Sequence, residues 1–248
     1  MRLAQTERRQ YILTAVILFL PLCFLLVPLK SKSTCIIIHC QGNRIIAVAD
    51  TRSNLFSKDG KSKGSIILQK IHRVNNIFFA ISGHYDQHIY FYALKALQQH
   101  ANLDDAINTE ISSTVVFFDS AMKAEKKSSP DSYKKWLITP VAAVAFFGFN
   151  QVNPFIVRII FFMKEENGIP KIYPIVHNDR TTVALGVYEH IETKIPQVSP
   201  QPQYSLSEKD LVNLVLEEQK HHPNDVSCPI DILTVTATNN ALTRQPCK

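Results

Sequence analysis

Two side chains near the start of the chain could take part in nucleophilic chemistry: the hydroxyl of Thr34 and the carboxylate of Asp50. Thr34 opens an apolar, β-rich segment, and Asp50 ends the next such segment sixteen residues later. A tight turn at residues 41–44 would return the second strand to the start of the first, so the two side chains are expected to be neighbours. Each of them alone is usually structural, because threonine favours strands and aspartate favours turns. The spacing therefore marks a candidate pair.

The residues before Thr34 have the composition of an export leader. A basic start is followed by an uncharged apolar run over residues 11–29, which is typical of an export signal. Ser31 and Ser33 supply the small residues that a signal peptidase reads, and a cut after Ser33 would make Thr34 the new N-terminus. The run is also just long enough to span a bilayer, so an uncleaved anchor remains an alternative.

We therefore divide the chain into residues 1–33, a signal peptide or N-terminal membrane anchor, and residues 34–248, a single domain. The expected location is outside the cytoplasm, in a periplasm, a lumen or the extracellular space. The alternative is a domain held at a membrane by one N-terminal transmembrane helix.

Charge and cysteine content exclude several classes of function. The net charge is +6, but five of the 27 basic residues and one of the 21 acidic residues lie in residues 1–33, which leaves 22 and 20 in the remainder. A charge of +2 gives no reason to expect a nucleic acid as partner. Of the five cysteines, Cys23 lies in the leader, and no pair of the others has zinc-site spacing. We expect no metal and no cofactor, and the disulfide pairing stays open.

The pattern of apolar residues predicts an α+β domain. Strands are expected on either side of the turn at residues 41–44, within 66–82, and at 141–149, 154–163, 171–176, 181–187 and 230–237. Helices are expected over about 84–101, 104–126 and 207–221, with Ser207 and Asp210 as a capping box. Residues 51–64, 127–133 and 239–248 are predicted to be loops or tail. Strands that are apolar on both faces favour covered sheets, for which a four-layer αββα sandwich is the best fit.

Four landmarks in the first third of the chain resemble the proteasome β-type subunits of the N-terminal-nucleophile (Ntn) hydrolase family. They are a threonine opening a strand, an Ala-Asp-x-Arg-Ser motif, a Lys-Ile pair and a Ser-Gly pair, found here as Thr34, Ala49-Asp50-Thr51-Arg52-Ser53, Lys70-Ile71 and Ser82-Gly83. Beyond Gly83 the resemblance extends only to the order of the elements.

The resemblance implies a threonine-type hydrolase with Thr34, Asp50, Lys70 and Gly83 as its catalytic residues. The free α-amine of Thr34 would act as the base for its own hydroxyl. Lys70, held by Asp50, would supply a fixed positive charge beside that hydroxyl. The backbone N–H of Gly83 would stabilise the oxyanion. A peptide or other amide is the substrate that this chemistry implies, and family resemblance also implies a homo-oligomer, with the membrane involved only through the N-terminal segment.

Three departures from the family pattern keep other functions open. Ser33 stands where self-processing members carry glycine, Val187 stands where members carry serine, and Asp225 and Ser227 only approximate an Asp-x-x-Ser motif. One alternative is a catalytically inactive proteasome-like scaffold or assembly subunit. The other is a membrane-anchored binding domain whose uncut leader blocks the amine that catalysis requires.

Overall fold

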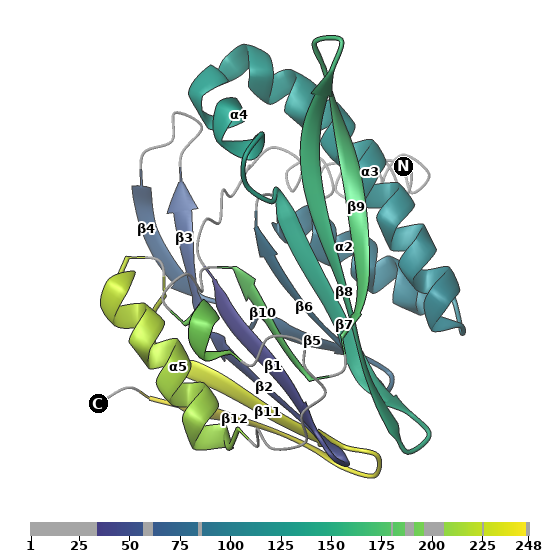
Figure 1. Cartoon of the computed structure of the whole chain (residues 1–248), viewed down its shortest axis with the longest axis vertical. Coiled ribbons are helices and arrows are strands. Elements are labelled where there is room, and N and C mark those ends of the chain that lie inside the picture. The colour runs from purple at the N-terminus through teal and green to yellow at the C-terminus, as the bar shows by residue number, and fades with distance from the viewer. Residues whose placement is uncertain are drawn as a thin grey trace, which may run out of the picture.

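The computed structural model describes most of the chain from Thr34 onward (Figure 1). The described residues are 34–56, 62–83, 86–179, 181–186, 191–195, 206–224 and 226–246. The predicted leader lies outside these ranges, as do Val187, Asp225 and Cys247. Among the helices of these ranges, none combines the length and the apolar character needed to cross a membrane.

The first sheet carries the strand that follows Thr34, and it is antiparallel throughout. In spatial order its strands are β10 (Thr182–Gly186), β1 (Cys35–Gln41), β2 (Arg44–Asp50), β11 (Ile230–Thr236) and β12 (Asn240–Gln245). Successive side chains of β1 alternate between two core clusters, with Ile36 and Ile38 in one and Cys35 and Ile37 in the other. A strand that is apolar on both faces has to be covered on both, as the sequence predicted.

The second sheet is also antiparallel and has its strands in chain order. They are β5 (Ile71–Val74), β6 (Ile77–Gly83), β7 (Ala142–Asn150), β8 (Asn153–Glu166) and β9 (Ile169–Asp179). The predicted Asn-Gly turn between β8 and β9 is confirmed, because Asn167 and Gly168 have φ values of 51° and 77°, the backbone that a tight hairpin requires.

The helices of the described residues are α2 (Asp86–Gln99), α3 (Leu103–Ser128), α4 (Pro130–Trp136), α5 (Glu208–His221) and the short 3-10 helix η1 (Glu192–Lys194). Two of them begin with a side-chain cap, α3 at Asn102 and α5 at Ser207. The predicted capping box of α5 is confirmed: the Ser207 hydroxyl accepts from the Asp210 N–H, and the Asp210 carboxylate accepts from the Ser207 N–H. These bonds satisfy donors that the first turn of a helix leaves free.

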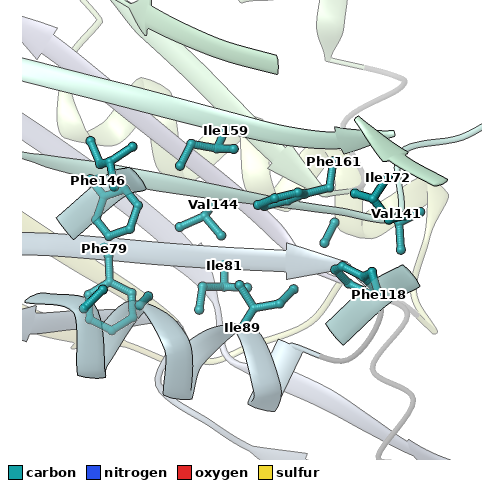
Figure 2. Close-up of a cluster of buried hydrophobic side chains, with 14 of the residues drawn as sticks. Phe79, Ile81, Ile89, Phe118, Val141, Val144, Phe146, Ile159, Phe161 and Ile172 are labelled. Atoms are coloured by element: carbon teal, nitrogen blue, oxygen red, sulfur yellow. The ribbon is translucent and has the colours of Figure 1, made fainter. Parts of the chain in front are cut away.

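Three clusters of buried side chains hold these elements together. One lies between the two sheets and includes Ile36 of β1 and Phe147 of β7. The second joins the first sheet to α5, which contributes Leu211. The third joins the second sheet to α2 and α3, and Figure 2 shows Ile89 and Phe118 of these helices against β6, β7 and β8. Helices thus pack against antiparallel sheets, and the predicted α+β class is confirmed.

Three segments predicted to lack regular structure have some. Residues 52–56 and 62–67 form a separate two-stranded sheet of β3 (Arg52–Phe56) and β4 (Ser62–Ile67). The predicted loop at 127–133 contains the start of α4, where Pro130 occupies the first turn and its missing N–H costs nothing. The predicted tail contains β12, all of whose residues are exposed, so no alternation of apolar residues revealed it.

Candidate active site

Thr34 lies immediately before β1 and is almost completely buried, with 4% of its surface exposed. β1 lies between β10 and β2 in the first sheet (Figure 1). The pairing of Ile36 with Ala49 places Cys35 opposite Asp50 at the end of the hairpin. The hairpin thus brings the start of β1 beside the end of β2, as its sequence predicted.

The carboxylate of Asp50 is fully buried and accepts a hydrogen bond from the main chain at the start of β1. The Cys35 N–H donates to Asp50 Oδ1 over 2.7 Å. A buried carboxylate needs hydrogen bonds and a countercharge to remain ionised. The backbone of the β1–β2 hairpin supplies such a hydrogen bond.

The countercharge comes from Lys70, which lies just before β5 and is 7% exposed. Its Nζ lies 3.2 Å from Oδ1 and 3.1 Å from Oδ2 of Asp50. The same Nζ donates a hydrogen bond of 2.7 Å to Thr34 Oγ1. Three of the four predicted site residues are therefore joined through one ammonium group, although they come from three different segments.

This arrangement favours negative charge on the Thr34 oxygen. An ammonium group held beside a hydroxyl stabilises the alkoxide that forms when the hydroxyl proton leaves. The neighbouring thiol is in the opposite situation: burial, followed by the charges of Asp50 and Glu218, raises the pKa of Cys35 well above its usual value. Since the thiolate is the reactive form of cysteine, this environment disfavours reaction at Cys35.

Gly83 lies at the end of β6, opposite Ala142 of β7. Its φ is +119°, and a side chain there would place its Cβ 2.5 Å from Ala142 Cα and 2.6 Å from the Val141 carbonyl oxygen. The structure thus gives Gly83 a steric role in the second sheet. Its role as an oxyanion donor stays a prediction.

Gly186 is a residue of the site that the sequence did not predict. It ends β10 and pairs with Cys35, and its φ is +88°. A Cβ at this position would lie 1.7 Å from the carbonyl oxygen of Thr34, which no side chain can tolerate. A glycine ending an apolar strand was the available signal, but only the β1–β10 pairing shows what approaches it.

The segment before β11 supports the site from the other side of β2. Ile230 pairs with Asp50, and the Thr51 hydroxyl donates to the carbonyl oxygen of Pro229 over 2.7 Å. Ser227, the serine of the approximate Asp-x-x-Ser motif, is half-buried, and its hydroxyl is 3.5 Å from the Cys228 carbonyl oxygen. Its predicted partner Asp225 lies outside the described residues, as does Val187.

No group of three or more His, Cys, Asp and Glu side chains in the described part of the chain is arranged to hold a metal ion. The groups assembled around Thr34 are a hydroxyl, a carboxylate and an ammonium. These groups suit acyl transfer from an amide or ester to the hydroxyl.

Comparison with known proteins shows a likeness of fold. No model of a known protein family matches the chain, and no curated protein is similar to it. Among solved structures, it resembles Anbu from Hyphomicrobium sp. strain MC1 with a TM-score of 0.53 and 12% identity, over 86% of this chain and 88% of that one. A Gly-1 mutant of the same protein gives a TM-score of 0.52 and 12% identity, over 87% and 88%.

These comparisons correct the family assignment made from the sequence. Assignment to the proteasome β-type subunits is wrong as stated, because no family model matches and the structures that the chain resembles are those of Anbu, a proteasome-like protein. A chain can retain four short motifs in its first third while the rest of its sequence changes. These motifs alone therefore do not establish the family. At 12% identity, the likeness concerns the fold and not the activity.

Proposed function

We propose that this protein is an exported threonine-type Ntn hydrolase that cleaves peptide or other amide bonds after a cut behind Ser33 frees Thr34. One observation carries the proposal: Lys70 Nζ lies 2.7 Å from Thr34 Oγ1 and 3.1 Å from Asp50 Oδ2. A cation held by a buried carboxylate cannot swing away from the hydroxyl. The positive charge is therefore already in place when negative charge develops on Oγ1.

The proposed reaction begins with the free α-amine of Thr34, whose ordinary pKa of about 7.7–8.0 lets it accept a proton near neutrality. The amine takes the hydroxyl proton while Oγ1 attacks the amide carbonyl carbon, and the N–H of Gly83 donates to the resulting oxyanion. The C–N bond then breaks, and the leaving amine takes the proton from the α-ammonium group. Water hydrolyses the acyl ester on Thr34 and regenerates the hydroxyl.

Lys70 acts in this scheme as a charge and not as a base. Its ammonium lies against both oxygens of the fully buried Asp50 carboxylate. The base is instead the amine of the same residue that supplies the nucleophile. A chain that keeps residues 1–33 has a peptide bond at this nitrogen and lacks the base.

Residues 34–248 are the proposed hydrolase domain, with residues 1–33 as its leader. The three core clusters support a four-layer αββα arrangement for this domain, with α5 on one side and α2 and α3 on the other. Export is supported by the apolar leader and by Cys228, which is disulfide-bonded, because disulfides persist in oxidising compartments. A homo-oligomer also stays a prediction, to be checked by native mass spectrometry.

The proposal is tested by comparing two forms of the purified domain. One begins at Thr34, and the matched form carries a single extra glycine before it, so that only the free amine differs. We expect a fluorogenic peptide-amide library to be hydrolysed by the first form, and the rate to fall by at least about 100-fold in the second and in Thr34→Ala. Equal rates in both forms would contradict the mechanism, and no turnover in either would favour the scaffold.

A further inference from the structure

Large apolar side chains face solvent on two segments far apart in the sequence. Ile138, which follows α4, is 85% exposed, more than any other large apolar residue of the described ranges. Leu137 beside it is 38% exposed, and Ile169, at the turn between β8 and β9, is 49% exposed. Apolar residues scattered singly over a surface are normal, whereas a group of them marks an interaction site.

Hydrogen bonds and an ion pair hold these two segments together. Lys126 of α3 donates to the carbonyl oxygen of Gly168 in the β8–β9 turn over 2.7 Å, and its Nζ lies 3.1 Å from Glu165 Oε2. The same carboxylate oxygen accepts a bond of 2.7 Å from the Tyr133 hydroxyl of α4. Figure 1 shows α4 and the β8–β9 turn at the same end of the molecule. The exposed apolar residues therefore belong to one surface.

The exposure of Ile138 follows from the way α4 is anchored. Trp136 is 7% exposed, and its Nε1–H donates to Glu125 Oε1 of α3 over 3.3 Å. The N–H groups of Leu137 and Ile138 donate to carbonyl oxygens in the last turn of α4, each over 3.2 Å. Trp136 thus fills the position against α3, while the ordered backbone after it holds Ile138 in solvent.

The two segments also carry the excess positive charge of the domain. Residues 123–138 and 164–171 contain seven lysines and four acidic residues. The other residues from 34 onward contain 15 Lys and Arg and 16 Asp and Glu. We call these two segments together the basic end, because the rest of the domain has almost no net charge.

Ion pairs within the basic end leave several of its lysines available. Of its four acidic residues, Glu125 is buried, and each of the other three pairs with a lysine of the same end. Within the described residues, no ion pair involves three of the exposed lysines, which are Lys123, Lys127 and Lys135. Their charges are therefore free to attract an anionic partner.

Exposed lysines around exposed aliphatic side chains are the combination that binds anionic membrane surfaces. We propose that the basic end binds a lipid bilayer with anionic headgroups, its lysines contacting the lipid phosphates and Ile138 and Ile169 entering the boundary with the acyl chains. A nucleic acid would contact the lysines but would offer no apolar environment to Ile138. The sequence linked the membrane only to residues 1–33, whereas this contact is made by the folded domain and is independent of the proposed hydrolase activity.

The test uses the fluorescence of Trp136, which directly precedes Leu137 and is the one tryptophan of the chain. Full-length protein is mixed with vesicles that carry a spin-labelled lipid, made of phosphatidylcholine with or without phosphatidylglycerol. Residues 1–33 contain no tryptophan, so quenching reports the approach of the basic end even if the leader also binds the vesicle. We expect quenching by the anionic vesicles, at least about 10-fold weaker binding to the neutral ones, and release in about 1 M NaCl, where the Debye length is about 3 Å.

Two variants and a matched control assign the contact to this surface. Ile138→Ser, and Lys134→Gln combined with Lys135→Gln, should each weaken the quenching interaction at least about 5-fold. The control Val152→Ser, at a side chain 69% exposed in the β7–β8 turn at the other end of β8, should leave it unchanged. Absence of quenching by anionic vesicles, equal quenching by neutral ones, or an equal loss in Val152→Ser would overturn the proposal. Self-association that Ile138→Ser abolishes, without quenching by any vesicle, would overturn it in favour of a second copy of the chain.

Discussion

Replacement of Lys70 by methionine should destabilise the fold strongly, because it breaks a buried ion pair on one side only. Met has nearly the length of Lys but no charge, so Asp50 would lose its countercharge while keeping its bond from the Cys35 N–H. Two unit charges 3.1 Å apart attract by about 5 kcal/mol at an effective dielectric constant of about 20. Removing one member of a buried pair costs roughly 3–5 kcal/mol, and we expect the free energy of unfolding at pH 7 to fall by that amount.

A second substitution separates the lost charge from lost packing. In Lys70→Met with Asp50→Asn, no buried charge is left unpaired, so the double variant should be at least about 2 kcal/mol more stable than Lys70→Met alone. The matched control is Lys171→Met, which breaks the Lys171–Glu166 pair at 2.9 Å, whose partners are 54% and 45% exposed. Because solvent screens this exposed pair, it should change the free energy of unfolding far less than Lys70→Met does.

The assay is urea unfolding followed by the fluorescence of Trp136, the one tryptophan of the chain, which is 7% exposed. Linear extrapolation gives the free energy of unfolding of each variant. If Lys70→Met lies within about 1 kcal/mol of the wild type, or if Asp50→Asn adds its full cost to it, the two side chains are not a buried, coupled pair. The electrostatic account of Thr34 would then lose its basis.

Three further predictions follow from single features of the structure. Gly186→Ala should abolish hydrolysis and lower stability well beyond the roughly 1 kcal/mol of the control Gly168→Ala, which also has positive φ but no atom within 4 Å of the added Cβ. Equal costs would show that Thr34 does not approach Gly186. Burial raises the pKa of Glu110 from 4.5 to about 8, so the folded state binds this proton more tightly and stability is lost as pH rises through that window, by up to about 1.4 kcal/mol per unit. Glu110→Gln should flatten this dependence of the free energy of unfolding on pH, measured by urea titrations between pH 5 and 8. An unchanged slope would mean that another group causes it. Ser207→Ala removes a cap and should cost about 1 kcal/mol by thermal unfolding, whereas an unchanged Tm would mean that the capping box contributes nothing.

Local features of the fold could be predicted from the sequence because their causes are local. The β1–β2 hairpin follows from two apolar runs around one turn, and it alone brings Asp50 to the start of β1. The capping box of Ser207 and Asp210 depends on residues three apart. Lys70 was suggested by family resemblance, and its contact with Thr34 and Asp50 is a matter of how the two sheets pack.

Other features depend on partners far away in the sequence. The approach of Gly186 to Thr34 needs the pairing of β10 with β1, which no local pattern specifies. β12 has no buried residue, so it is a strand only because β11 offers an edge. The family assignment failed for a related reason: a few short motifs in the first third of the chain say little about the rest of it.

The central claim is that Thr34 becomes the N-terminus and the nucleophile. It is tested most directly by intact and peptide mass spectrometry of the protein from its native compartment, treated with a β-lactone that acylates N-terminal threonine hydroxyls. The account predicts a chain that begins at Thr34 and carries one acyl group on the peptide that starts there. A chain that begins at Met1 or at any residue other than Thr34, or an acyl group elsewhere, would contradict it.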